Sequence, residues 1–161
     1  MKGLSVVVVS IAVCLSATRD GRANERPDEE QIRQAIHDQE TAWNRGNARD
    51  YVAHFQKEGA FTNVVGVTYE TRDAFEARVA QIFATIFNGS NLSNTVRKIR
   101  FVRPDVAIVS ITTEISGLKG SPPGVKASAD GKLRMNKLEV MVKENGQWWV
   151  AAFHNLDVKV E

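Results

Sequence analysis

The sequence predicts one domain of the α+β class, with helices packed on one face of a curved antiparallel sheet. Two observations on its 161 residues lead to this prediction. Apolar residues recur at helical spacing in three segments between residues 31 and 87, and at strand spacing from Thr95 onward. A short strand pair precedes the third helical segment, so the helices and the sheet should share one core.

Residues 1–23 have the pattern of a secretory signal peptide. Lys2 precedes an apolar run that ends at Ala17, and this run is shorter than the about 20 residues that a membrane-spanning helix needs. Cleavage is expected after Ala23, with Ala17 as the alternative site. The sequence therefore predicts a secreted or periplasmic protein. A retained N-terminal anchor and a lipoprotein attached through Cys14 are the alternatives.

Removal of residues 1–23 would change the charge and the cysteine content of the chain. It would take away three basic residues and one acidic residue, which leaves equal numbers of the two. Composition then gives no reason to expect binding to nucleic acid, or to a membrane in the mature form. The single cysteine would also be lost, so the mature domain must be stabilised by its core rather than by a disulfide.

The first helix is expected from about residue 31. Residues 24–30 are polar, contain Pro27 and predict a disordered lead-in, so the folded domain should span residues 31–161. Gly46 suits the C-terminal end of the helix. Its apolar stripe, at steps of three and four positions, consists of Ile32, Ala35, Ile36, Gln39 and Trp43.

A second helix, a strand pair and a third helix follow. The second helix should end before Gly59, and strands near residues 61–65 and 67–70 should meet at a bend at Gly66. Thr71 can cap the third helix, because its hydroxyl can accept a hydrogen bond from a backbone N–H of the first turn. The apolar stripe of this helix consists of Phe75, Val79, Ile82, Phe83 and Ile86.

The remainder of the chain has strand periodicity and is rich in β-branched residues. Strands are expected at residues 96–102, 106–115, 133–143 and 148–160. The segment 118–132 is rich in proline and glycine and predicts a loop.

The turn between the last two strands decides which side chains face the helices. A two-residue turn would pair Glu144 with Gln147, whereas a three-residue loop would pair Lys143 with Gln147. The two-residue turn would place Lys137, Glu139 and Lys143 beside apolar residues of the last strand, and burial of unpaired charges is costly. We therefore expect the three-residue loop.

The expected register has two consequences. It turns Asn136 and His154 toward the helices, where a cavity would lie. It leaves Met141, Trp149 and Phe153 on the opposite face, which is then too apolar for a fully solvated sheet surface. We expect this face to form a homodimer contact.

Four short patterns occur in a fixed order between residues 30 and 157: AWNRGNARDYVAHF, AFTNVVG, VRPDVAIV and NGQWWVAAFHN. Together they resemble the SgcJ/EcaC-type branch of the SnoaL-like superfamily. The resemblance implies a nuclear transport factor two-like, or cystatin-like, fold: a cone-shaped curved antiparallel sheet wrapped around three N-terminal helices. It also implies a pocket between the long helix and the concave sheet, and usually a dimer. It implies no single activity, because relatives include cyclases, isomerases, dehydratases and association domains.

His154 is the candidate catalytic residue, because a histidine with a pKa near neutrality can act as a general acid or base. A hydrogen-bonded histidine without chemistry is the alternative. For Trp43 and Phe83, plain core packing is the alternative to ligand contact. Aromatic rings would supply contact area and amides would orient a ligand. The expected ligand-binding residues are Trp43, Asn63, Tyr69, Phe83 and Asn136.

The sequence contains no Gly-rich dinucleotide loop, no cysteine pair and no three histidines at metal-ligand spacing. We therefore expect no cofactor and no metal ion. Two functions are compatible with these patterns. One is an exported protein that binds a small hydrophobic molecule in a pocket, with proton-transfer chemistry at His154 as its enzymatic form. The other is a non-catalytic, dimeric association module.

Overall fold

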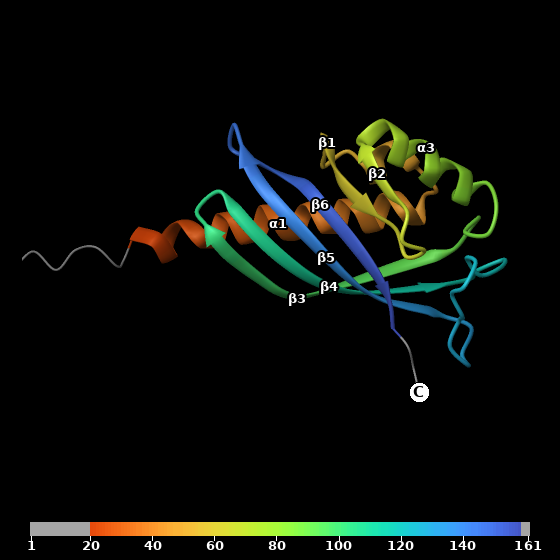
Figure 1. Cartoon of the computed structure of the whole chain (residues 1–161). Coiled ribbons are helices and arrows are strands. Elements are labelled where there is room, and N and C mark those ends of the chain that lie inside the picture. Colours follow the sequence, from red (N-terminus) through yellow and green to blue (C-terminus); the bar gives the residue numbers. More distant parts are fainter. Residues whose placement is uncertain (1–19, 159–161) are drawn as a thin grey trace, which may run out of the picture.

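The computed structural model describes residues 20–158, and side chains from Arg26 onward (Figure 1). Residues 1–19 of the expected signal peptide, including Cys14, lie outside the described residues, and so do residues 159–161. Within the described part, no helix combines the length and the apolar character needed to cross a membrane.

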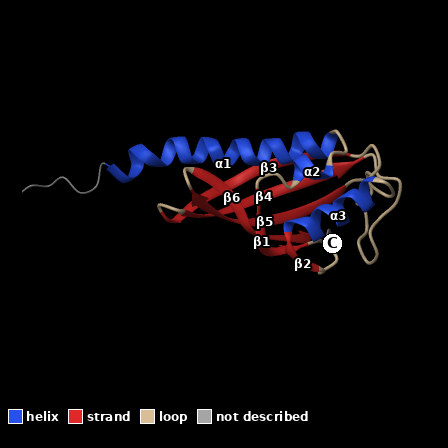
Figure 2. Ribbon diagram, turned by 90° about the horizontal axis from the view of Figure 1, so that it is seen from above, coloured by secondary structure: helices blue, strands red, loops and turns tan. Residues whose placement is uncertain are grey.

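Helix α1, Asp20–Asn44, runs along the concave side of the sheet (Figure 2). It includes residues 24–30, so the disordered lead-in expected there is instead helical. The reason is a tertiary contact at Asp28, which is only 4% exposed. Its carboxylate accepts hydrogen bonds from Lys143 Nζ at 2.6 Å and Trp148 Nε1 at 3.0 Å, both on the last hairpin.

Two shorter helices, α2 (Ala48–Tyr51) and α3 (Arg72–Phe83), pack at one end of the sheet (Figure 1). The predicted cap of α3 is confirmed, because Thr71 Oγ1 accepts a hydrogen bond from the backbone N–H of Ala74 at 3.3 Å. Helix α2 is shorter than expected, since the chain is already a strand at Phe55.

Six strands form one curved sheet in the order β2-β1-β6-β5-β4-β3. Neighbouring strands are antiparallel except β1 and β6, which are parallel. The sheet curves around α1, which confirms the predicted α+β class (Figures 1 and 2). The strands are β1 (Phe55–Thr62), β2 (Thr68–Thr71), β3 (Asn91–Arg103), β4 (Val106–Ser116), β5 (Leu133–Glu144) and β6 (Gln147–Asp157).

The turn between β5 and β6 has two residues, and the expected three-residue loop is wrong. Glu144 pairs with Gln147. Asn145 and Gly146 have φ angles of 52° and 81°. Positive φ at both central positions is the requirement of a type I′ turn, whose twist matches that of the two strands.

A β-bulge in β6 then changes which residues face the helices. Met141 pairs with Val150 and Val140 pairs with Ala152, so Ala151 has no partner in β5. One unpaired residue reverses the alternation of all side chains beyond it. As a result, buried positions follow two different phases along β6: Trp148 and Val150 before the bulge, and Phe153 after it.

The observed register reverses the expected faces of β5 and of the part of β6 beyond the bulge at Ala151. Asn136 and His154 are exposed on the outer face rather than turned toward the helices. Met141 and Phe153, expected at an outer dimer face, are 0% and 3% exposed in the core, and Trp149 is half-buried. The two-residue turn and the bulge together cause this difference. The expected faces assumed strict alternation of side chains along β6, and the bulge interrupts that alternation.

The core between the helices and the sheet is largely aromatic. The ring of Phe75 in α3 lies 5.5 to 5.7 Å from the rings of Phe55, Phe61 and Phe153. These distances are typical of aromatic pairs in protein interiors. The cluster fixes α3 over the β1–β6 side of the sheet and forms one wall of a cavity.

Candidate functional site

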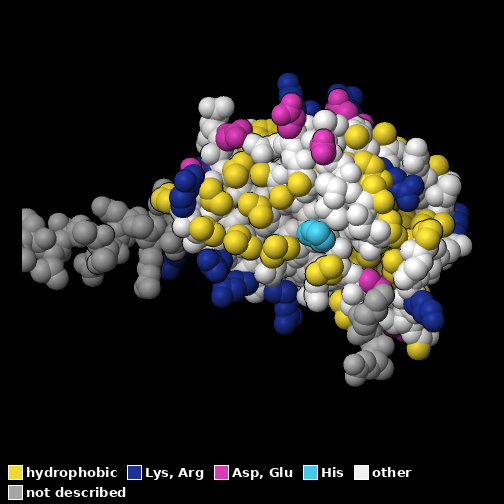
Figure 3. Space-filling model, viewed as in Figure 1, with side chains coloured by type: hydrophobic (Ala, Val, Ile, Leu, Met, Phe, Trp, Pro, Cys, Tyr) yellow, Lys and Arg dark blue, Asp and Glu magenta, His cyan; other side chains and the backbone are white. Residues whose placement is uncertain are grey.

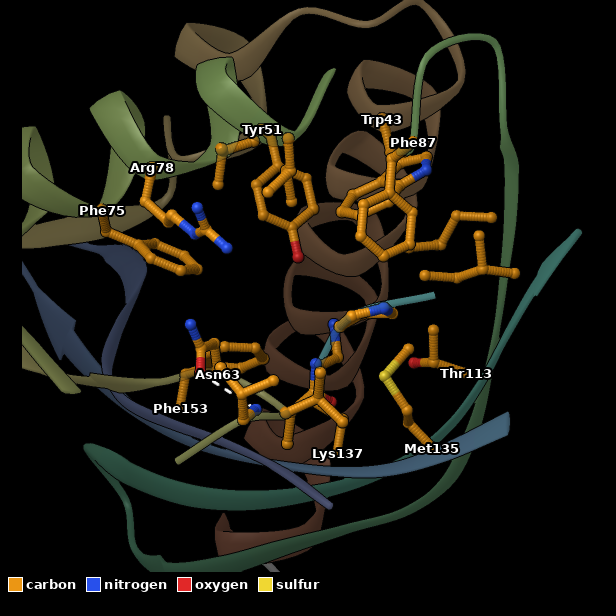
Figure 4. Close-up of a pocket in the computed structure, with 18 of the residues that line it drawn as sticks. Trp43, Tyr51, Asn63, Phe75, Arg78, Phe87, Thr113, Met135, Lys137 and Phe153 are labelled. Carbon is orange, nitrogen blue, oxygen red and sulfur yellow. Dashed lines mark hydrogen bonds between the residues drawn. The ribbon is translucent and has the colours of Figure 1, made fainter. Parts of the chain in front are cut away.

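A pocket with a volume of about 70 Å³ lies between α3, the C-terminal half of α1 and the concave sheet (Figure 4). Aliphatic and aromatic side chains form most of its wall. Its rings and largest apolar side chains are Trp43, Tyr51, Phe75, Phe87, Met135 and Phe153. Such an apolar cavity with a few polar groups is the usual form of a small-molecule site.

Two of the expected ligand-binding residues, Trp43 and Asn63, line this pocket. The Trp43 ring packs edge-on against Phe83, with ring centroids 4.9 Å apart, so Phe83 supports the wall from behind. Tyr69 packs against Phe75 at 5.7 Å, outside the lining. Phe83 and Tyr69 therefore do not line the pocket but support the lining residues Trp43 and Phe75.

Asn136 and His154 do not reach the pocket. Both lie on the outer face of the sheet, within a shallow depression that also contains Leu138 and Leu156. The expectation that they share a cavity with Asn63 is wrong, because the two-residue turn and the bulge at Ala151 turn both side chains to the outer face of the sheet. His154 therefore cannot act on a molecule bound between α3 and the sheet.

Tyr51 is a pocket residue that the sequence did not single out. It is 4% exposed, and its hydroxyl points into the cavity (Figure 4). Burial raises the pKa of Tyr51, and the negative charge of Glu139 raises it further. The phenol is therefore protonated at neutral pH and is available as a donor. Among the described residues, no group accepts a hydrogen bond from it.

A buried polar network lies next to Tyr51. Lys137 Nζ is 3.1 Å from Glu139 Oε1, an ion pair without the geometry of a directed hydrogen bond. Lys137 Nζ also donates to Gln39 Oε1 at 3.0 Å, and Gln39 Nε2 donates to Glu139 Oε2 at 3.4 Å. Lys137 lines the pocket, whereas Glu139 and Gln39 lie behind the lining.

The sequence contains a pattern that indicates this network. Lys137 and Glu139 are two positions apart on a strand, so they share one face. Gln39 lies on the apolar stripe of the first helix. A polar residue on an apolar face, together with two opposite charges on one face of a strand, is the pattern expected when buried polar groups satisfy one another.

The remaining polar atoms of the pocket differ in whether they are already hydrogen-bonded. Trp43 Nε1 donates to Ser90 Oγ at 3.0 Å, and Thr113 Oγ1 donates to Asn94 Oδ1 at 2.7 Å, so both are satisfied. Asn155 lines the pocket, and its Oδ1 is buried without a partner among the described residues.

The charged groups of the lining are both cations, Arg78 and Lys137. No Asp or Glu of the described chain lines the pocket. In the same part of the chain, no group of three His, Cys, Asp or Glu side chains is placed to hold a metal ion. The pocket therefore encloses apolar surface and offers a ligand the donors Tyr51, Arg78 and Lys137, with the unpaired Asn155 Oδ1 as an acceptor.

The fold is shared with solved structures. A domain of unknown function with a cystatin-like fold from Nostoc punctiforme is 24% identical, with a TM-score of 0.71 over 84% of this chain and 80% of that chain. An NTF-2 like protein of unknown function from Shewanella oneidensis is 19% identical, with a TM-score of 0.66 over 81% of this chain and 99% of that chain.

A ketosteroid isomerase-like protein from Erwinia carotovora is 17% identical, with a TM-score of 0.64 over 84% of this chain and 99% of that chain. No protein-family model and no curated protein sequence matches the chain. At these identities the likeness shows the fold alone. The chain therefore has the cystatin-like, nuclear transport factor two-like fold that its sequence predicts, and its activity has to be argued from the pocket.

Proposed function

We propose that this protein binds a small, mostly apolar molecule whose oxygen atom accepts a hydrogen bond from Tyr51. The observation that carries the proposal is the hydroxyl of Tyr51, a residue that is 4% exposed: it points into an apolar cavity and has no hydrogen-bond partner among the described residues. A ligand oxygen would supply the acceptor that the described residues do not, so the pocket should select molecules that carry one.

The size and lining of the pocket support a compact ligand. A volume of about 70 Å³ and walls of Trp43, Phe75, Phe87 and Phe153 suit a single ring or a short branched chain. Any proton transfer in this pocket has to use Tyr51 or Lys137, because His154 lies on the other face of the sheet. The proposal therefore concerns binding, and His154 has no part in it.

Two further parts of the proposal rest on sequence patterns. The four patterns between residues 30 and 157 support a place in the SgcJ/EcaC-type branch of the SnoaL-like superfamily. The charged and apolar pattern of residues 1–23 supports export to the periplasm or the outside of the cell.

Tyr51→Phe tests the binding proposal. We expect acetophenone, which has one ring and one acceptor oxygen, to bind about three- to tenfold more weakly to this variant, because one hydrogen bond is lost. Toluene, which lacks the oxygen, should bind the two proteins equally. Chemical-shift changes of backbone amides around the pocket measure both affinities. Because the lost hydroxyl has no partner, the variant should be at least as stable as the native protein.

Tyr69→Phe is the matched control, since Tyr69 is a half-buried tyrosine outside the lining. It should leave both affinities unchanged. Failure of a panel of neutral one-ring compounds to shift any pocket resonance would reject the binding proposal. Equal acetophenone binding by native protein and Tyr51→Phe would reject the role of the hydroxyl.

An association module is the second candidate function, and a specific surface favours it. Apolar side chains cover the middle of the outer sheet face, with a histidine among them and Lys and Arg side chains along one edge (Figure 3). Leu138 and Leu156 are 44% and 61% exposed there. A second copy of the chain would cover this surface through a twofold axis. Light scattering should then give twice the monomer mass.

A further inference from the structure

The mouth of the pocket, where lining side chains are partly exposed, contains two hydrogen-bond donors, Arg78 and Asn63. Figure 4 shows the Arg78 guanidinium and the Asn63 amide turned toward the same part of the cavity. Arg78 is half-buried, and its one hydrogen bond is a long contact of 3.5 Å from Nη1 to Gln81 Oε1 on the same helix. No carboxylate of residues 26–158 pairs with it.

The orientation of the Asn63 amide follows from its backbone contacts. Asn63 Oδ1 accepts hydrogen bonds from the N–H groups of Val65 at 3.1 Å and Val67 at 3.0 Å, within the β1–β2 turn. Because a backbone N–H requires an oxygen acceptor, these two bonds fix the amide oxygen on the turn side. The Nδ2 group is then directed toward the cavity as a free donor.

The charges of the lining add up to one uncompensated positive charge. Lys137 is neutralised by Glu139 at 3.1 Å, and Arg78 has no such partner. A partly desolvated guanidinium is stabilised by an anion, and its planar N–H groups fit a carboxylate with two parallel hydrogen bonds. A monoanion would balance the pocket, whereas a phosphate dianion would leave a buried negative charge without a partner.

We propose that the ligand of this pocket is a monocarboxylate with a compact apolar body. Its carboxylate lies between Arg78 and Asn63 Nδ2 at the mouth, and its body lies among the aromatic rings behind them. This inference rests on the proposed binding function and adds the chemical class of the ligand to it. Arg78 and Asn63 are then the residues that determine specificity for an acid over a neutral molecule.

Benzoate and benzamide test this inference, because they share one shape and differ in charge. We expect the native protein to bind benzoate at least ten times more tightly than benzamide, as measured by backbone amide shifts. Arg78→Gln should weaken benzoate binding about ten- to a hundredfold, the loss of a charge-assisted pair, and leave benzamide unchanged. Added salt should weaken benzoate binding to the native protein only.

Arg100→Gln is the matched control, since it removes one exposed arginine of β3 and should not affect benzoate. Thermal unfolding of Arg78→Gln shows whether the variant is folded, and Arg78→Lys should recover part of the affinity. Equal binding of the two probes, no binding of benzoate, or unchanged benzoate binding by Arg78→Gln would overturn the carboxylate proposal. Binding of neutral one-ring compounds, with its dependence on Tyr51, would then still stand.

Discussion

Lys137 and Glu139 lie next to each other on the inner side of β5 and are 4% and 0% exposed. Two buried charges are tolerated here because they neutralise each other and because Gln39 hydrogen-bonds to both. Such a pair often adds little net stability, yet removal of one partner leaves the other charge buried without compensation. The pair also fixes the ammonium of Lys137 at the pocket wall.

Glu139→Gln should lower the free energy of unfolding by about 3–5 kcal/mol, because Lys137 then loses its counter-charge. The double variant Lys137→Met/Glu139→Leu should be much closer to the native stability, since it removes both charges at once. Urea denaturation measures both changes. If the double variant were as unstable as Glu139→Gln, the loss would come from packing and the charge argument would be wrong.

A matched control for these variants lies at the surface. Glu114 pairs with Lys132 at 2.5 Å and with Arg134 at 3.1 Å. Hydrogen bonding from Lys132, offset in part by desolvation, lowers the pKa of Glu114. Because water solvates this cluster, Glu114→Gln should change stability far less than Glu139→Gln.

At the scale of single residues, the sequence indicated part of the pocket. Trp43 and Asn63 were expected there from the resemblance and their neighbours, and both line it. Tyr51 lies in the segment of the predicted second helix, and the sequence gives no sign that its hydroxyl is the most informative group of the site. A tyrosine on an apolar stripe fits a core equally well, so only the direction of its hydroxyl in three dimensions separates the two roles.

At the scale of elements, the strand register of the β5–β6 hairpin determines which of its side chains line the pocket. Its two-residue turn sets the pairing near the tip, and its bulge at Ala151 changes the pairing further along. Asp28 of α1 holds the same hairpin through Lys143 and Trp148. The two-residue turn, the bulge and the hydrogen bonds to Asp28 together place Lys137 and Phe153 on the inner face of the sheet.

Gly146→Ala should destabilise the protein by roughly 1 kcal/mol, because Gly146 has a φ of 81° that an L side chain rarely adopts. Nothing lies within 4 Å of the position of the added methyl group, so the effect is one of the backbone alone. Urea denaturation should detect the change. An equally stable Gly146→Ala variant would show that the turn has another conformation in solution.

Asn145→Gly is the companion variant for the same turn. Asn145 has a φ of 52°, which glycine adopts without strain. This variant should therefore keep both the stability and the strand register. Unchanged amide resonances at the pocket would show that the register of β5 against β6 is retained.

Elements were easier to predict than their pairing. The Thr71 cap, the third helix and the loop of residues 118–132 all followed from local patterns. The hairpin register was harder to predict. Asn145-Gly146 is the local pattern of a two-residue turn, but the cost of burying Lys137 and Glu139 argued against that turn, and local alternation contains no information about the bulge at Ala151. Lys137 and Glu139 can be buried because Gln39, a hundred positions earlier in the chain than Glu139, hydrogen-bonds to both.

At the scale of the whole molecule, the sheet has two apolar faces. The inner face packs against α1 and α3 and encloses the pocket, whereas the outer face exposes Leu138 and Leu156 beside His154. A contiguous apolar surface of this kind is usually covered by a partner. We therefore still propose a homodimer, but its contact surface consists of Leu138, Leu156 and His154 rather than Met141 and Phe153.

Leu138→Glu should reduce the mass in solution from that of a dimer to that of a monomer, because it places like charges opposite each other across the twofold axis. Light scattering over a range of protein concentrations is the measurement. Val67→Glu is the control, since Val67 is 47% exposed in the β1–β2 turn, away from the outer face of the central strands. A native protein that stays monomeric at high concentration would contradict the dimer.

The sequence by itself determined the class of fold, the order of most helices and strands, and the presence of a pocket in the expected place. The fold class and the order of the elements depend on periodicity, caps and turn residues, which act between neighbours in the chain, whereas the pocket is what the resemblance to a known superfamily implies. Only the tertiary structure decided that Tyr51, Arg78 and Lys137 share that pocket and that His154 does not. The bulge at Ala151 turns His154 away from the pocket. The convergence of the other three residues depends on contacts between elements far apart in sequence, and such contacts leave no local pattern to read.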